Sequence, residues 1–222
     1  MNVELVSVTQ PVKRLMDEGI KDADDLVAYI ARVSNPDNQL NTLTAPRLVK
    51  YLTKHRHWSP FEMTDMCVEI KTSRAIAAQI LRHRSFSFQE FSQRYSSVNT
   101  FEDIEWRLQG KTNRQVGDES VDLDKQLEHS ISLHLDNSLL LYDELLTQGV
   151  AKECARNILP LTTETTMYMK GNFRSWIHYI DLRTCEDTQK EHRDIAFKCK
   201  EIFVNTFPKT GDALNWNDNN TV

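Results

Sequence analysis

The segment that most constrains the fold is a helical pattern at residues 121–148, which is ended by Gly149. Glycine often follows a helix end, because it adopts the left-handed backbone conformation at little steric cost. A helix that is apolar on two sides is usually covered twice, by its own domain and by a partner. This pattern therefore predicts self-association, because apolar side chains form two lines along it: Leu127, Ile131, Leu141 and Leu145, and Leu135, Leu139, Tyr142 and Leu146.

Changes in hydrophobic period divide the rest of the chain into shorter elements. Alternation and β-prone composition predict strands at 3–8, 63–72 and 161–172. The polar stretch 98–120 predicts a long surface loop, and Thr188 with Glu191 has the spacing of a capping box before a last helix. Spacings of three and four residues predict further helices at 22–33, about 44–55, 73–84, 150–159 and 173–183.

Helices dominate this pattern, and the strands are not separated in a regular βαβ rhythm. The sequence therefore predicts an α+β fold, with a helix-rich single domain and a small, mostly antiparallel sheet. A chain of 222 residues suits one domain. We expect a single domain over 1–222, with its core at about 1–207 and a polar tail that includes NWNDNNTV.

The charge distribution is uneven. The formal net charge is −5, which argues against nucleic-acid binding by the whole surface. Yet the stretch LRHRSFSFQEFSQRY, residues 81–95, forms a basic island that suits a small anionic ligand. The four cysteines are scattered, and there is no leading apolar stretch and no run of about 18 apolar residues, so we expect a cytoplasmic protein with free thiols and no membrane span.

Gln79, Arg82 and His83 have the spacing of one helical face within the predicted helix 73–84. An amide beside an arginine suits a planar, oxygen-rich ligand, because a guanidinium can bind phosphate or carboxylate through two hydrogen bonds. Spacing alone leaves a second reading equally open. Cations are also favoured at the end of any solvated helix by the helix dipole.

The motif around this island resembles the signature of the flavin-dependent thymidylate synthases. Arg82, His83 and Arg84 are followed, after seven residues, by Ser92 and then by the tripeptide QRY. Four further blocks resemble segments of that family and keep its order over roughly 28–195: ARVSNP (31–36), KHRHWSPFE (54–62), ARNILPL (155–161) and NFRSWIHYIDLR (172–183).

The resemblance implies a homotetramer whose active sites are built from more than one subunit. It implies conversion of dUMP to dTMP, with methylenetetrahydrofolate as carbon donor and with FAD, reduced by NADPH, as the hydride source. No cysteine of the enzyme attacks the uracil in this family. The implied partners are dUMP and further copies of the chain, with no nucleic acid, no membrane and no metal.

The resemblance also implies site residues. Arg183 and Ser92 are the expected catalytic residues, because an arginine against the uracil ring would stabilise its polarised form. The family often has asparagine where this chain has Gln89, so that amide is one methylene longer. The dUMP positions are Gln79, Arg82, Glu90, Ser92, Gln93, Arg94, Arg156 and Arg183, and the FAD positions are Ser34, His57, Ser59, Glu62, Arg82, His83, Arg84, Ser85, Gln89, Asn172, Arg174 and His178.

Two other readings of the same residues stay open. His55 and His57, with Glu62, could hold a metal, although such histidine pairs usually lie on a surface or in a core. The arginines of the basic island and its phenylalanines could instead form a stacking platform for RNA in a protein without enzymatic activity. Flavin colour in the purified protein separates the enzyme from the RNA-binding alternative.

Overall fold

The computed structural model describes residues 1–97 and 100–216, and its main element is a four-stranded antiparallel sheet. The strands are β1 (Asn2–Val8), β2 (Asp65–Ser73), β3 (Ser87–Glu90) and β6 (Glu164–Asn172), and they lie in the order β1-β2-β6-β3. A separate hairpin pairs β4 (Arg107–Gln109) with β5 (Gly117–Ser120). The small antiparallel sheet and the abundant helices confirm the predicted α+β class.

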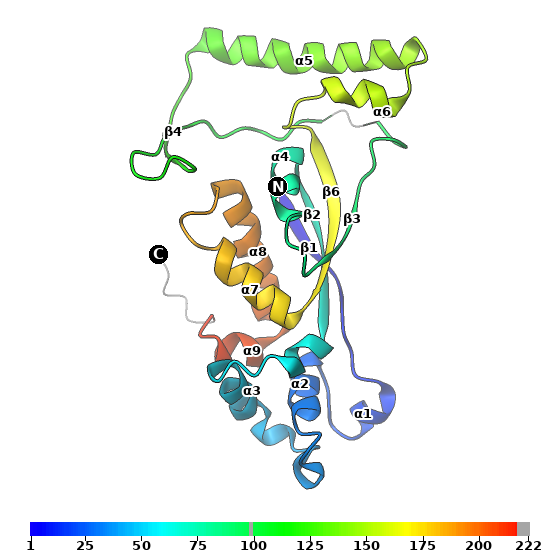
Figure 1. Cartoon of the computed structure of the whole chain (residues 1–222), viewed down its shortest axis with the longest axis vertical. Helices are drawn as coiled ribbons and strands as arrows, with labels where there is room; N and C mark the ends of the chain where they lie inside the picture. The colour runs from blue at the N-terminus through cyan, green and yellow to red at the C-terminus, as the bar shows by residue number, and fades with distance from the viewer. Residues whose placement is uncertain (98–99, 217–222) are drawn as a thin grey trace.

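The helices surround this sheet on one face and at both of its ends. Helices α7 and α8 pack on the face that points into the core, α2, α3 and α9 gather at one end, and α5 with α6 lies across the other (Figure 1). Short 3-10 turns lie at Pro36–Asn38, Thr42–Thr44, Ser59–Met63 and Arg156–Ile158. The helices are α1 (Lys13–Asp17), α2 (Ala23–Ala31), α3 (Ala45–Lys54), α4 (Arg74–Ile80), α5 (Lys125–Thr147), α6 (Lys152–Ala155), α7 (Phe173–Arg183), α8 (Lys190–Thr206) and α9 (Pro208–Ala213).

The alternation of β2 places every second side chain in the core. Met66, Val68 and Ile70 are fully buried, while Glu69 and Lys71 point to the opposite face. Trp176 of α7 fixes the helix on the sheet, because its indole N–H donates a hydrogen bond of 3.0 Å to the Met66 carbonyl. Two chemically different faces follow, an apolar one under the helices and a polar one on the outside.

Helix α5 is the long helix that the sequence predicts, but its own domain covers little of it. Only Ser138 and Tyr142 are buried along its length. Leu140 is 67% exposed and Leu141 is 54% exposed. Leu127, on the same line as Leu141, is 46% exposed, whereas Leu135, Leu139 and Leu146 of the other line are half-buried. The line through Leu127 and Leu141 is therefore the less covered one within one chain.

The predicted helix 73–84 stops early, and this corrects the expected grouping of side chains. Helix α4 ends at Ile80, so Arg82 and His83 lie in the following turn and do not share a helical face with Gln79. The physical reason is Phe86, whose buried ring packs against Trp176 and draws the chain away from the helix axis. Gly171 allows this approach, since a Cβ there would lie 2.5 Å from the Phe86 ring.

Three further expectations change in the structure. The predicted loop 98–120 contains the β4–β5 hairpin, with residues 98–99 outside the described residues. The capping box does not form, because Gln189 is the N-cap of α8 and the Thr188 hydroxyl donates to the Leu182 carbonyl instead. The Trp216 ring packs edge to face against Phe203, so the packed core extends beyond 207. Residues 217–222 of the predicted tail lie outside the described residues.

Candidate active site

The first group of predicted site residues meets where α4, α7 and α8 converge. The Arg183 Nε at the end of α7 donates a hydrogen bond of 2.9 Å to Nε2 of His83. Gln79, on the last turn of α4, donates from Nε2 to the side-chain Oε1 of Gln189 at 2.6 Å. Arg82 is exposed beside them. Tertiary packing thus brings together residues that lie about a hundred positions apart in the chain.

Two imidazoles in this group are neutral. Burial, followed by the positive charges of Arg183 and His178, lowers the pKa of His83 to about 4. Burial and the charges of Arg183 and His83 lower the pKa of His192 to about 3. A neutral His83 can accept the hydrogen bond from Arg183 at its Nε2 atom, whereas a charged imidazolium has no free lone pair and cannot. The hydrogen bond and the lowered pKa are therefore consistent with each other.

The second group lines a cavity of about 860 Å³, a volume in the range of ligand sites. Three separated segments supply its walls: the turn before Ser59–Met63, the turn after α4, and the start of α7. Five predicted FAD residues converge here. The lining is Arg56, Trp58, Glu62, Ser85, Asn172, Arg174, Ser175, Ile177, His178 and Asp181.

Local hydrogen bonds hold the walls of this cavity. Asn172 is the N-cap of α7, and its side-chain oxygen accepts from the Ser175 amide at 2.9 Å. The Ser175 hydroxyl donates to the Ser85 carbonyl at 3.3 Å, which ties α7 to the turn after α4. Arg174 forms an ion pair with Glu62 across the cavity wall. These contacts at the start of α7 fix the position of Arg174, and its ion pair fixes the position of Glu62.

The remaining FAD candidates lie around this cavity or apart from it. His57 and Ser59 do not line it, but their neighbours Arg56 and Trp58 do. Ser34 lies in another cavity, of about 430 Å³, between α2 and α3. Arg84 is exposed in the turn after α4. The structure therefore places Ser34 in a different cavity from the five predicted flavin residues that line the cavity of about 860 Å³.

The third group lies at the end of β3, where Gln89 faces outward beside Tyr168 and Glu90 lies opposite the buried Met167. Gln89, Glu90 and Ser92 line a cavity of about 570 Å³ with Tyr168 and Lys71. The Glu90 carboxylate is held from two sides, by the Thr165 hydroxyl at 2.9 Å and by Arg74 at 3.3 Å. The Glu90 carboxylate is therefore held in place as a hydrogen-bond acceptor at the end of β3.

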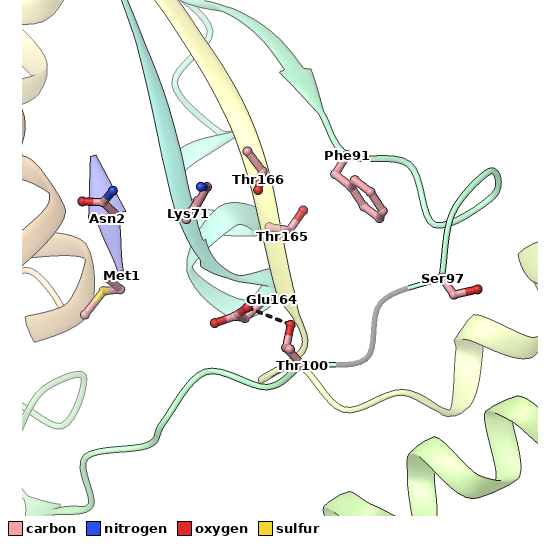
Figure 2. A pocket seen from close by; sticks show the side chains of 9 residues that line it. All are labelled: Met1, Asn2, Lys71, Phe91, Ser97, Thr100, Glu164, Thr165 and Thr166. Carbon is pink, nitrogen blue, oxygen red and sulfur yellow. Dashed lines mark hydrogen bonds between the residues drawn. The ribbon is translucent and has the colours of Figure 1, made fainter. Parts of the chain in front are cut away.

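A neighbouring cavity of about 440 Å³ shares Lys71, Phe91 and Thr166 with this one. Figure 2 shows the Phe91 ring and the Lys71 and Thr166 side chains around it, with the Thr100 hydroxyl donating to Glu164 at 2.8 Å. The two cavities therefore adjoin along β2 and β6. Among the described residues, Gln79, Arg82 and Arg183 line neither of them.

The last predicted dUMP residues lie beside α6. Arg94 pairs with Glu153 at 3.4 Å, and Arg156 begins the turn that follows α6. Gln93 is buried, and within the described part of the chain its Nε2 has no hydrogen-bond partner. The predicted dUMP residues thus fall in two places, one at the α4–α7–α8 junction and one at the end of β3 with α6.

Sequence reasoning missed several residues that contact the predicted ones. Gln189 and Glu191 bind in series behind Gln79, and Arg107 of the hairpin pairs with Glu191. Glu191 has the spacing of a capping box with Thr188, and this spacing does not reveal its contacts with Gln189 and Arg107. In the described residues, no group of three or more His, Cys, Asp or Glu side chains could hold a metal ion, and no helix is long and apolar enough to cross a membrane.

Comparison with known proteins identifies the family. The model of the family described as "Thymidylate synthase complementing protein" matches residues 14–209. A "Probable flavin-dependent thymidylate synthase" of Paramecium bursaria Chlorella virus 1 is 52% identical over 219 residues, which cover 97% of this chain and 100% of the relative. A "Flavin-dependent thymidylate synthase" of Synechocystis is 46% identical over 218 residues, with the same shares covered.

A solved structure agrees with this result. The UMP/dUMP methylase PolB from Streptomyces cacaoi, bound with 5-Br dUMP, superposes with a TM-score of 0.79 at 26% identity. The alignment covers 97% of this chain and 94% of that one. Fold and sequence define an α+β protein of the thymidylate synthase complementing class. The chain belongs to the flavin-dependent thymidylate synthase family.

Proposed function

We propose that this flavin-dependent thymidylate synthase converts dUMP to dTMP, with FAD as its flavin. Methylenetetrahydrofolate donates the carbon and NADPH reduces the flavin. The observation that carries this proposal is the convergence of Glu62, Ser85, Asn172, Arg174 and His178 on one cavity of about 860 Å³. These residues come from three separated segments, and the family resemblance implies a flavin contact for each of them.

The chemistry of the cavity fits a flavin. Arg56 and Arg174 are cations that suit phosphates, and Trp58 and Ile177 offer apolar surface to a planar ring. Arg56 adopts a φ of 56° as the left-handed residue that follows the end of α3, where the His57 amide donates to the Leu52 carbonyl. When bound, the flavin supplies the hydride. The chain binds it, orients it and excludes water.

The nucleotide residues have separate tasks in this proposal. Arg82 and Arg94 are exposed cations that can bind the dUMP phosphate, with Arg156 as a third. Ser92 offers a hydroxyl at the end of β3, beside the Glu90 carboxylate. Among the described residues the Arg183 side chain donates to His83 through Nε, which leaves its terminal guanidinium nitrogens for a ligand. Its charge would stabilise negative charge on the uracil ring.

We further propose that four copies assemble and share their sites. Two observations support this. Four leucines of α5 are exposed within one chain: Leu127, Leu133, Leu140 and Leu141. The two sets of dUMP residues lie in different places, so a second copy is needed to bring one set against the other. We also place the enzyme in the cytoplasm, a proposal that rests on its scattered free cysteines.

The RNA-binding alternative loses support from the packing of the basic island. Phe86 is buried against Trp176 and Tyr179, so its ring cannot stack on bases. Phe88 is half-buried and packs on the core. Two of the aromatic rings that a stacking platform would need are therefore committed to the fold.

The test of the proposed function is anaerobic turnover. Purified protein is incubated with FAD, NADPH, methylenetetrahydrofolate and dUMP, and dTMP is measured by chromatography. We expect dTMP only when all four are present, and a yellow protein with flavin absorbance. An Arg174→Ala variant is the matched control, and we expect it to bind less flavin. A flavin-loaded protein that forms no dTMP contradicts the assignment.

A further inference from the structure

A chain of side-chain hydrogen bonds runs behind Gln79 to the surface hairpin. The Gln79 Nε2 donates to Gln189 Oε1 at 2.6 Å, and the Gln189 Nε2 donates to Glu191 Oε2 at 2.9 Å. The other Glu191 oxygen pairs with the guanidinium of Arg107 on β4. The series therefore links a predicted nucleotide residue to the β4–β5 hairpin.

The series has a direction, which is set by its carboxylate end. An ionised carboxylate only accepts hydrogen bonds, so Gln189 must turn its NH2 toward Glu191. Its carbonyl oxygen then faces Gln79, and only the NH2 of Gln79 can meet it. If either amide were reversed, two NH2 groups or two carbonyls would face each other. The Glu191 carboxylate therefore sets the orientation of the Gln79 amide: its NH2 group points to Gln189 and its carbonyl oxygen points away.

The anchor of this series is charged and largely shielded from water. The side chains of Arg107 and Glu191 are 11% and 19% exposed. Burial acts to raise the pKa of Glu191, but hydrogen bonds from Arg107, the backbone and Gln189 outweigh it and hold that pKa below its ordinary value. Glu191 therefore stays ionised at neutral pH. Glu105 adds a second carboxylate beside Arg107, at 3.4 Å, and pairs with Lys190 at 3.0 Å.

The carbonyl end of Gln79 is also occupied. His192 Nδ1 lies 3.4 Å from Gln79 Oε1, and the imidazole is fully buried. Because His192 is neutral, one tautomer can donate its Nδ1 proton to that oxygen. The NH2 group of Gln79 thus bonds to Gln189, just before α8, and its carbonyl oxygen lies beside His192 in α8. A free glutamine side chain would lose rotamer freedom on binding a ligand, whereas this one is already held.

We propose that Gln189 is a positioning residue of the nucleotide site, and that with Glu191 and Arg107 it fixes the orientation of the Gln79 amide. This inference rests on the proposed function, in which Gln79 contacts dUMP. It gives the hairpin a task that its sequence did not reveal. Arg107 lies on the β4–β5 hairpin and forms an ion pair with Glu191. The Glu191 carboxylate in turn sets the orientation of the Gln189 and Gln79 amides.

The test is a double-variant cycle on dUMP binding to the FAD-loaded protein. Gln189→Met removes both hydrogen bonds at nearly constant volume. We expect the dUMP dissociation constant to rise roughly 3- to 10-fold, the effect of losing about one hydrogen bond. FAD affinity and turnover at saturating dUMP should stay within about twofold of the original protein. Gln79→Met combined with Gln189→Met should bind dUMP no more weakly than Gln79→Met alone, because the two residues act through one another.

The matched control is Asn113→Ala on the same hairpin. Asn113 Nδ2 donates to Asp187 Oδ1 at 3.1 Å, so its loss removes one exposed hairpin contact that lies outside the series, while the Arg107–Glu191 pair remains. We expect unchanged dUMP affinity in that variant. Arg107→Met should weaken dUMP binding like Gln189→Met, and Arg107→Lys should restore part of it. These variants also keep the test valid if Gln189→Met does not fold.

Specific results overturn the inference. Additive effects of the Gln79 and Gln189 changes would mean that the residues act independently. An unchanged dUMP dissociation constant in Gln189→Met, or equal losses of dUMP and FAD affinity, would assign Gln189 a purely structural task. Failure of the proposed function is seen separately, because the original protein would then form no dTMP.

Discussion

The Nε of Arg183 lies 2.9 Å from Nε2 of His83, and it donates to the neutral imidazole. The two residues come from the end of α7 and from the turn after α4. One is placed at the uracil ring and the other at the flavin in the proposed enzyme. This contact joins the two ligand sites through one hydrogen bond, and its existence depends on the protonation state of His83.

Acid should weaken the fold through His83 and His192. Their pKa values are lowered to about 4 and about 3, against about 6.5 in an unfolded chain. The unfolded chain therefore binds more protons as pH falls, so stability that is complete above pH 6.5 is lost from there toward pH 4. We expect urea unfolding to show a loss on the order of 1–3 kcal/mol per histidine, which is discounted for partial exposure.

The control for this experiment is His55→Gln, because His55 is exposed at the end of α3, away from α5. We expect the loss of stability in acid to persist in that variant. His192→Gln removes the buried imidazole, so the free energy of unfolding should change less with pH in that variant. Equal pH dependence in His192→Gln and the original protein would mean that the buried imidazole does not govern acid stability.

Arg82→Ala and Arg183→Ala should fail in different ways. Arg82 is exposed near the flavin and nucleotide residues, so its loss removes a charge-assisted contact worth about 1.5–3 kcal/mol and weakens dUMP and FAD binding. Arg183 is expected to act on the ring, so its loss should lower the rate at saturating dUMP more than it lowers FAD affinity. Single-turnover flavin oxidation and FAD titration separate the two effects. If Arg183→Ala loses flavin but turns over normally at saturating FAD, the assignment to the ring is wrong.

Asn172→Ala should destabilise the cavity wall. The Asn172 side chain caps α7, and N-cap loss costs about 0.5–2 kcal/mol. We expect a lower melting temperature and weaker FAD binding, because α7 carries Arg174 and His178. Asn172→Asp is the matched variant, since aspartate keeps the cap, and its melting temperature should stay close to that of the original protein. Equal destabilisation by both changes would rule out the cap as the cause.

The four cysteines should be dispensable for chemistry. Burial raises the pKa of Cys199 to about 12, so this thiol cannot supply a thiolate at neutral pH. Burial also raises the pKa of Cys67. A variant with all four cysteines replaced by serine or alanine is expected to be less stable, because Cys199 is in the core, yet to keep forming dTMP. A folded, flavin-loaded variant without any turnover would point to a nucleophilic thiol.

The proposed assembly predicts that charges on α5 break the oligomer. Leu140→Glu with Leu141→Glu places carboxylates on the exposed apolar surface of this helix. We expect a smaller particle in light scattering and a loss of dTMP formation, since the sites would be incomplete. Leu43→Glu is the control, because Leu43 is 93% exposed on another part of the chain. An active monomer with intact α5 would refute shared sites.

The sequence by itself determined the elements whose pattern is local. Alternation predicted a strand at 63–72, which overlaps β2 and its buried Met66, Val68 and Ile70, and the helix predicted at about 173–183 is α7. The R-H-R motif and its accompanying blocks indicated the family, because they fix unusual residues at fixed spacing. Periodicity reports which side of an element is buried, and that information lies within a few neighbouring residues.

Only the tertiary structure decided where α4 ends and what its last residues contact. The helix pattern runs on past Ile80, but burying the Phe86 ring against Trp176 outweighs one more helical turn. Gln79 meets Gln189, and His83 meets Arg183, at separations of 110 and 100 residues. Such pairs depend on how whole helices pack, and no local spacing encodes them. The same packing separates the two sets of nucleotide residues within one chain, because α6 and the end of α7 lie in different parts of the fold.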